Sequence, residues 1–428
     1  MKVKVLISVA CAVIALVGSA GCGRGGGEVL EEKEVRHHAA SELDPAIVEA
    51  ANRFGLALYG RMAGASPSEN NLLLSPLSVS AALALVASGA KNETEDEMKR
   101  MLGLEHYSSE SIGSGYRVFL DLLNHPQDDG IGLTFASSLW LSEKRKFNSK
   151  FIDDSMSNFA AETFPYDALS SSAAKRMNDW AAKKTNGAIK KVIDQVDQNS
   201  VMYVLNAIDF DGAWTTPFRP EATSRAKFYP TGFPSEGDYF VRMMSQGGMY
   251  EYGSMDGYEI IRLPIGRHGS AYMAVILPAK VEGALAKLQA NIVSDLSLLT
   301  GKLDIRQGTI ELPKTKFDYA TNINDSLKAL GMNAAFDSLK ASFPGIAEPL
   351  PDMNVFIGRV NHSTSFDMNE DGVSASAVTM IEAMAGAAPP SPEGPFRMTV
   401  DRPFIVSIID RETGSILFVG TVAHPNAD

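Results

Sequence analysis

The order of helical and strand-like patterns constrains the fold of this chain more than any other feature of its sequence. Helical periodicity is present at 46–64, 76–88, 93–102, 172–185, 283–299 and 322–331. Strand-like alternation or apolar runs occupy 132–141, 201–210, 271–277, 309–317, 355–368, 403–410 and 415–422. Helices dominate the first half and strands the second, which favours an α+β fold over alternating βαβ units. With no internal repeat, and no second Gly/Pro/Ser-rich break between Pro45 and about residue 389, we expect one domain over 46–428.

The first 45 residues differ in amino-acid composition from the rest of the chain. A basic head, Lys2 and Lys4, precedes an apolar run, Val5–Val17, and then small residues up to Cys22. This layout is typical of a bacterial export signal and is too short for a retained membrane span. Two cleavage positions are open: before Cys22, which would then carry lipid, or after Ala20. We expect residues 1–21 to be a signal peptide and 22–45 a flexible, lipid-anchored linker. The protein is then secreted to the cell envelope, outside the cytoplasm, and touches the membrane only through the lipid.

Cysteine content and charge exclude several classes of protein. The only cysteines are Cys11 and Cys22, so the body can hold neither a disulfide nor a cysteine-based zinc site. The net charge is −12 with no concentrated basic run, which argues against a nucleic-acid partner.

Catalytic motifs are also missing from the sequence. There is no G-x-S-x-G elbow and no H-E-x-x-H, and three chance S-x-x-K matches lack their S-D-N and K-T-G partners. The run Asp367–Gly372 reads D-x-N-x-D-G, like the start of a calcium loop, but the twelfth position is Val378 rather than Glu and a strand pattern precedes it. We therefore expect no enzyme activity, no metal and no cofactor.

An unusual segment lies near the C-terminus. Residues 373–388 contain no proline and a single charge, and alternate positions from Val373 to Ile381 form one small apolar face. Gly372 precedes the segment as a permissive hinge, and a proline-rich stretch from Pro389 to Pro395 follows it. The segment is either a low-complexity surface loop or a strand that is exposed now and can be inserted later.

Several stretches, in order over 46–428, resemble the serpin family. They are Asn71–Ser78, Gly89–Thr94, Leu205–Trp214, Pro217-Phe218, Met243-Met244, Leu277-Pro278, Leu312–Lys314, Leu330–Met332, Asn369–Gly372, Arg402–Phe404 and Phe418–Gly420. The resemblance implies an α+β serpin fold with three β-sheets, eight or nine helices and an exposed reactive-centre loop. It also implies a monomeric suicide-substrate inhibitor, which traps a protease as an acyl-enzyme by inserting the cleaved loop into the main sheet. A non-inhibitory serpin, acting as a cell-surface binding lipoprotein, is the alternative.

The resemblance also implies roles for particular residues. Ser75, Ser78, Asn206 and His362 match the polar cluster where the sheet must part, and Trp214 with the Lys314–Glu370 pair matches the place where insertion starts. The expected hinge comprises Glu370, Gly372, Val373, Ala375 and Ala377. The sequence departs from the family pattern at Gly358 and Val373, where serine and a small hydroxyl residue, respectively, are usual.

Counting seventeen residues from Glu370 places the reactive bond at Gly386–Ala387, with Met384–Ala385 as the alternative. The surrounding residues are small and apolar and include no Lys or Arg. They favour an elastase-like or subtilisin-like serine protease as the partner, with a papain-like cysteine protease as a further candidate.

Overall fold

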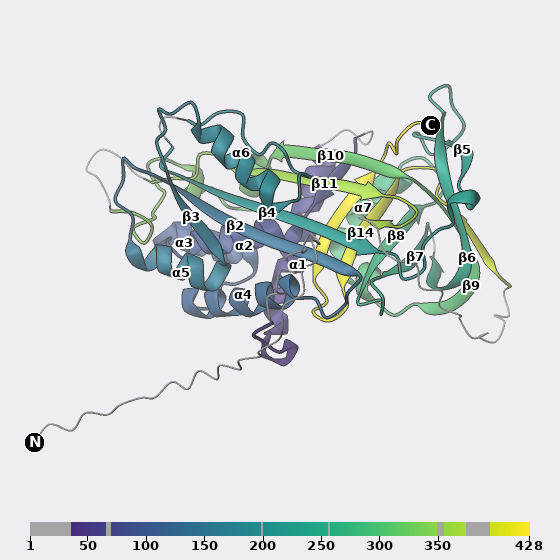
Figure 1. The fold of residues 1–428 in the computed structure, drawn as a ribbon, viewed down its shortest axis with the longest axis horizontal. Coiled ribbons are helices and arrows are strands. Elements are labelled where there is room, and N and C mark those ends of the chain that lie inside the picture. Colours follow the sequence, from purple (N-terminus) through teal and green to yellow (C-terminus); the bar gives the residue numbers. More distant parts are fainter. Residues whose placement is uncertain (1–35, 66–69, 198–199, 256, 349–354, 374–393) are drawn as a thin grey trace, which may run out of the picture. The chain divides into compact units, whose positions relative to one another are not determined.

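The computed structural model describes residues 36–65, 70–197, 200–255, 257–348, 355–373 and 394–428. In these residues nine α-helices are present: α1 (Pro45–Ala65), α2 (Pro76–Ala87), α3 (Asn92–Leu102), α4 (Ser109–Asn124), α5 (Ser149–Phe159), α6 (Ala173–Lys184), α7 (Ala284–Ser294), α8 (Ser297–Thr300) and α9 (Asn324–Ala329). The strands are β1 (Leu72–Leu74), β2 (Ile131–Ser142), β3 (Ala161–Tyr166), β4 (Met202–Ala213), β5 (Ser224–Phe228), β6 (Tyr239–Met255), β7 (Tyr258–Ile265), β8 (Ala271–Pro278), β9 (Asp304–Pro313), β10 (Thr315–Asn322), β11 (Asn361–Met368), β12 (Gly372–Val373), β13 (Phe396–Thr399), β14 (Phe404–Asp410) and β15 (Ile416–Val422). Figure 1 shows their arrangement and confirms the predicted α+β class.

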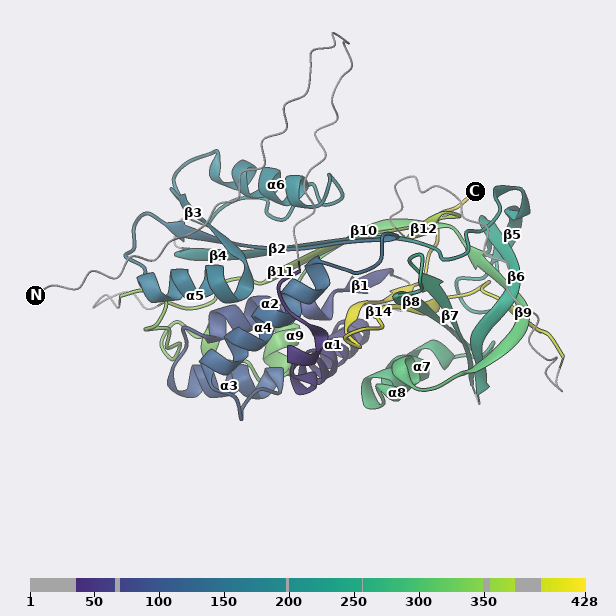
Figure 2. The same cartoon turned by 60° about the horizontal axis from the view of Figure 1, so that its bottom comes forward.

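A six-stranded sheet with the order β10-β11-β12-β4-β2-β3 forms one layer of the structure. All of its pairs are antiparallel except β2–β3. Helix α6 packs on one face, and α2, α4 and α5 pack beneath the other, as Figure 2 shows. Helices therefore cover parts of both faces, and most of β2 is buried.

The remaining strands form a nine-stranded sheet with the order β1-β15-β14-β8-β7-β6-β9-β13, and β5 pairs with β6. Hydrogen bonding thus unites the strands into two sheets where three were expected. The cause is the long strand β6, whose first part pairs with β5, whose middle pairs with β9 and whose last part pairs with β7. Two of the expected sheets are continuous through this one strand.

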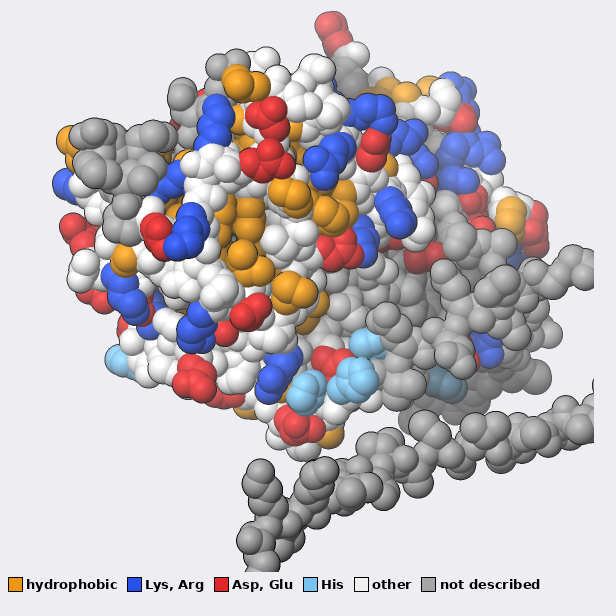
Figure 3. All heavy atoms as spheres, turned by 60° about the vertical axis from the view of Figure 1, so that its left-hand side comes forward, with side chains coloured by type: hydrophobic (Ala, Val, Ile, Leu, Met, Phe, Trp, Pro, Cys, Tyr) orange, Lys and Arg blue, Asp and Glu red, His pale blue; other side chains and the backbone are white. Residues whose placement is uncertain are grey.

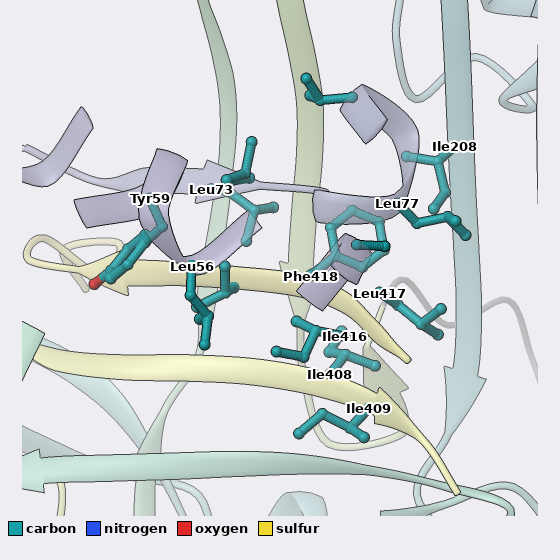
Figure 4. Packing of buried hydrophobic residues seen from close by; sticks show 14 of the residues in the cluster. Leu56, Tyr59, Leu73, Leu77, Ile208, Ile408, Ile409, Ile416, Leu417 and Phe418 are labelled. Carbon is teal, nitrogen blue, oxygen red and sulfur yellow. The ribbon is translucent and has the colours of Figure 1, made fainter. Parts of the chain in front are cut away.

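Helix α2 lies between the two sheets. It begins at Ser75, whose hydroxyl accepts the Ser78 N–H, and Pro76 occupies the first helical position, where it loses no hydrogen bond. Nearly every residue of α2 is buried, as expected for a helix with apolar side chains on all sides. Figure 4 shows Leu77 of this helix packed with Ile208 of the smaller sheet and Phe418 of the larger one.

The folded body begins earlier than the sequence predicted. Residues 22–45 were expected to be a flexible linker, but Ala40–Glu42 form a 3₁₀-helix. The Asp121 carboxylate of α4 accepts the backbone N–H groups of His37 and His38, at 2.9 and 2.7 Å. These contacts with α4 place residues from 36 onward in the folded body, and the linker prediction is wrong for 36–45.

Candidate functional site

The short strand β12 marks the point where the six-stranded sheet is incomplete. Gly372 and Val373 pair with Ala213 and Gly212 of β4 on one side, and Val373 pairs with Met368 of β11 on the other. Both pairings are antiparallel, so β4 and β11 run parallel to each other with β12 between them. Val373 is buried, with 2% of its surface exposed. The expected hinge residues Gly372 and Val373 therefore already form the first rung of a strand.

The close approach of the β4 backbone explains why glycine occupies position 372. A Cβ atom there would lie 2.2 Å from the carbonyl oxygen of Gly212, which is far inside van der Waals contact. Gly212 is equally constrained, because its own Cβ would lie 2.5 Å from Ile265 Cγ2. Beside the permissive hinge predicted at Gly372, the structure shows a second reason for glycine, because there is no space for a side chain.

Beyond Val373, β4 and β11 have no strand between them within the described residues. Neither strand pairs with the other in this part of the chain, and both pair with β12. Beside Val373, where β12 lies between them, β4 and β11 have the spacing of next-nearest strands, about 10 Å. A narrow cavity opens here beneath Val373, lined by Ile208–Phe210 of β4, Ser365-Phe366 of β11, and Ala188, Ile408 and Phe418.

A buried polar cluster lies further along the same two strands. The Ser75 N–H donates to Nε2 of His362 over 3.3 Å, and the Asn206 Nδ2 group donates to the Ser78 carbonyl over 2.6 Å. The four residues predicted to form this cluster are therefore brought together by α2, β4 and β11. The Asn206 Oδ1 atom is buried and has no hydrogen-bond partner among the described residues.

His362 is neutral in this environment. Its exposed fraction is 4%, and burial lowers its pKa to about 4, although a backbone hydrogen bond to Leu73 acts in the opposite direction. The neighbouring Thr364 hydroxyl also donates to the Leu73 carbonyl, at 3.2 Å. His362 thus joins β11 to the entry of α2 as an uncharged imidazole.

The residues predicted to mark the start of insertion lie together beside β12. Trp214 Nε1 donates to the Asn369 carbonyl and its backbone N–H to the Asp371 carbonyl, both over 2.9 Å. Lys314 Nζ lies 2.6 Å from Glu370 Oε2. These bonds tie the turn between β11 and β12 to the ends of β4 and β9.

Thr223 was not anticipated at this position. Its hydroxyl donates to Glu370 Oε1 over 2.8 Å, so that carboxylate has a partner on each oxygen. Partial burial would raise the pKa of Glu370, but the hydrogen bonds from Lys314 and Thr223 outweigh it and hold the pKa below its usual value. A contact across 147 residues of sequence leaves no local pattern from which it could be predicted.

Several predicted site residues lie outside the described residues. They are Ala375 and Ala377 of the hinge, Met384, Ala385, Gly386 and Ala387 of the two candidate reactive bonds, and Cys22. Within the described part of the chain, no group of three or more His, Cys, Asp or Glu side chains is placed to hold a metal ion. None of the described helices has the length and apolar character that a membrane span requires.

Comparisons with known proteins agree on one family. The family model described as Serpin (serine protease inhibitor) matches residues 49–425. An uncharacterized serpin-like protein of Thermococcus kodakarensis is 29% identical over 89% of this chain and 86% of its own, and alpha-1-antiproteinase 2 of Equus caballus is 28% identical over 92% and 90%. The thermophilic serpin tengpin in its native state superposes with a TM-score of 0.78 at 28% identity, covering 89% of this chain and 95% of that chain. A thyroxine-binding globulin complex with thyroxine gives a TM-score of 0.76 at 25% identity, covering 89% and 99%.

Proposed function

The chain belongs to the serpin family, and from that premise we propose that it inhibits a serine protease as a suicide substrate. Members of this family are generally protease inhibitors rather than catalysts. The protease supplies the nucleophile and forms an acyl-enzyme with the loop that follows Val373. Cleavage then frees the N-terminal half of the loop, which enters the main sheet and carries the bound protease with it. Serpin loop insertion is itself a known example of strand addition and strain release.

The observation that carries this proposal is the incomplete sheet. β12 already pairs on both sides, and within the described residues its two neighbours do not pair with each other along the cavity below it. A strand that continues from Val373 would complete both ladders and bury the small apolar face of residues 373–381. Inserting about 14 residues at ~3.3 Å each would move the protease roughly 45 Å.

The observed register predicts where each inserted residue would lie. Val373 pairs with Gly212 of β4 and Met368 of β11, and both pairings are antiparallel. For each residue after Val373, the residue number of the partner on β4 and on β11 would therefore decrease by one. Thr379, six residues on, would then lie between Asn206 and His362. It shares the side of the strand on which Val373 is buried, since side chains alternate. Its hydroxyl would therefore be directed at the buried cluster, where Asn206 Oδ1 has no donor among the described residues.

The residues of the loop indicate the class of protease. Residues 383–387 read Ala-Met-Ala-Gly-Ala. With the reactive bond at Gly386–Ala387, or at Met384–Ala385, such side chains suit the small or shallow pocket of an elastase-like or subtilisin-like protease. A papain-like cysteine protease is the further candidate.

Incubation with an elastase or a subtilisin tests the proposal. We expect a covalent complex that survives SDS, a C-terminal fragment whose mass locates the cut, and a large rise in the melting temperature of the cleaved protein. Rapid cleavage with no complex and no rise in melting temperature would instead support a non-inhibitory serpin that acts as a binding lipoprotein. Thyroxine-binding globulin shows that this fold also carries a binding function.

We further propose that Cys22 carries the lipid and holds the protein at the cell envelope, facing outside the cytoplasm. The support is the sequence pattern of residues 1–22 and the Gly-rich segment that follows it. Replacing Cys22 by serine should abolish labelling by a palmitate analogue and release the protein from the membrane fraction. Unchanged labelling would exclude this residue as the lipid site.

A further inference from the structure

The outer face of the β5–β6 hairpin carries an unusual set of side chains. In the antiparallel register of this pair, Arg225 lies opposite Arg242, and Lys227 lies opposite Phe240. Cross-strand partners project on the same side of a sheet. The alternate pair, Ala226 and Val241, therefore projects on the other side, and Val241 is fully buried there. Three cations and one aromatic ring are thus displayed together.

These four side chains are accessible to a partner. Arg225 is 58% exposed, Arg242 is 49% exposed and Phe240 is 37% exposed. Lys227 is also exposed. We call this surface of Arg225, Lys227, Phe240 and Arg242 the cationic face.

The paired arginines of the cationic face are unfavourable for the isolated protein, because like charges directly opposite each other destabilise a strand pair. Asp428 lies between the two arginines, 3.2 Å from Arg225 and 4.0 Å from Arg242, and offsets part of their repulsion. The Arg225 guanidinium lies 3.8 Å from the centre of the Phe240 ring. An arginine stacked on an aromatic ring is typical of residues that dominate binding at protein interfaces.

The position of the cationic face links it to the reactive loop. Thr223, directly before β5, donates its hydroxyl to Glu370 at the start of the loop, and the Arg242 carbonyl accepts the N–H of Lys314, the partner of Glu370. On the other side of the loop, the chain returns at β13, which pairs with β9, the neighbour of β6. Strands β5, β6 and β9 lie together at one end of the body, on the right in Figure 1. A protease held on the loop would therefore lie next to this hairpin.

The opposite end of the body differs in its charge pattern. Figure 3 shows basic and acidic side chains interspersed over that end. Some lysines there have acidic partners, such as Lys150 with Asp154 at 2.7 Å and Lys175 with Asp179 at 2.6 Å. A cationic face next to the loop is also unexpected in a chain whose net charge is −12.

We propose that the cationic face is an exosite that binds an acidic surface on the target protease beside its active site. This inference rests on the proposed inhibitory function and adds a requirement for the partner: small, apolar specificity together with negative charge at the rim of its cleft. Complementary charge would speed the encounter of the two proteins, by between 10- and 1,000-fold in known cases. The Phe240 ring would add an apolar contact that salt does not screen.

The test uses subtilisin and subtilisin whose surface lysines have been succinylated, which changes the charge of the protease and not its nucleophile. We expect the wild-type inhibitor to react faster with the succinylated form at low salt, by about tenfold. That preference should disappear near 1 M salt, where the Debye length is about 3 Å. The double variant Arg225→Glu with Arg242→Glu should reverse the preference. The matched control, Lys150→Glu with Lys175→Glu, makes the same change in net charge away from the hairpin and should leave the preference intact.

Equal rates of the wild-type protein with both proteases at low salt would overturn the exosite. A double variant that keeps the wild-type preference would overturn it as well. Unchanged melting temperatures of the free proteins show that the variants are folded. If the double variant does not fold, Arg242→Gln should still reduce the preference and Phe240→Ala should slow the reaction at every salt concentration. Failure of the wild-type protein to trap either protease contradicts the inhibitory function itself, which separates the two failures.

Discussion

The side chain at position 379 offers a direct test of the insertion register. Replacing Thr379 by valine removes one hydroxyl and keeps the shape of the side chain. In the uncut protein, Asn206 Oδ1 already lacks a partner among the described residues, so the stability of that form should not change. In the cleaved protein, the inserted valine would leave the same oxygen unsatisfied and permanently buried.

The expected loss can be worked out from this single acceptor. Leaving a buried acceptor unpaired costs about 1–3 kcal/mol relative to the satisfied state. For a domain of this size, an m-value of about 5 kcal/mol/M in guanidinium chloride is reasonable, because m grows with the surface exposed on unfolding. A loss of about 2 kcal/mol then moves the unfolding midpoint of the cleaved form by roughly 0.4 M.

The assay is guanidinium unfolding of each protein before and after cleavage in the loop. Thr379→Ser, which keeps the hydroxyl, serves as the control and should retain most of the wild-type midpoint after cleavage. Equal losses in the cut and uncut forms would show that Thr379 acts outside the sheet. No loss in either form would show that the inserted strand does not follow the register of β12.

Two further predictions follow from the buried residues around the gap. Folding lowers the pKa of His362 to about 4, so between about pH 6.5 and 4 the unfolded chain binds one more proton than the native protein. The free energy of unfolding should therefore fall by up to about 3 kcal/mol as the pH decreases through that window. Urea unfolding at pH 7 and pH 4.5 measures this fall, and a His362→Gln variant with the same pH dependence as wild type would contradict it. Gly372→Ala should destabilise the native protein by about 1–3 kcal/mol, because its Cβ would meet the Gly212 carbonyl. The control is Gly358→Ala, whose Cβ would meet no atom within 4 Å, and equal melting temperatures for the two variants would refute the steric argument.

Helices with clear termini were predictable from the sequence to within two residues. The predicted helix at 46–64 is α1, Pro45–Ala65, and the one at 93–102 is α3, Asn92–Leu102. The second of these ends at Gly103, which adopts the left-handed conformation that terminates helices. In such segments the local signals and the tertiary structure agree, which is why the sequence suffices.

Helix α4 was missed because its sequence contains two glycines, which disfavour helices in isolation. The structure shows the compensation: a Cβ at Gly115 would lie 2.0 Å from Ile47 of α1, and one at Gly113 would lie 2.6 Å from Asn158 of α5. The glycines allow close packing with two other helices. Only the partner helices reveal this, so the local pattern cannot.

The strand predicted at 309–317 is two strands in different sheets. β9 ends at Pro313, and β10 begins at Thr315. Between them, Lys314 donates its backbone N–H to Arg242 and its ammonium group pairs with Glu370. The alternation of side chains is continuous through this point, so periodicity alone does not reveal that the chain passes from one sheet to the other.

The strongest argument for insertion comes from two incomplete features that match each other. The sequence after Gly372 has the pattern of a buried strand but is followed by prolines that cannot continue one. Within the described residues, the structure has two strands that do not pair with each other, a buried acceptor without a donor and a first rung already formed at Val373. The register of β12 brings Thr379 to that acceptor, on the side of the strand where Val373 is buried. A surface loop of arbitrary sequence would have no reason to place a hydroxyl at this position.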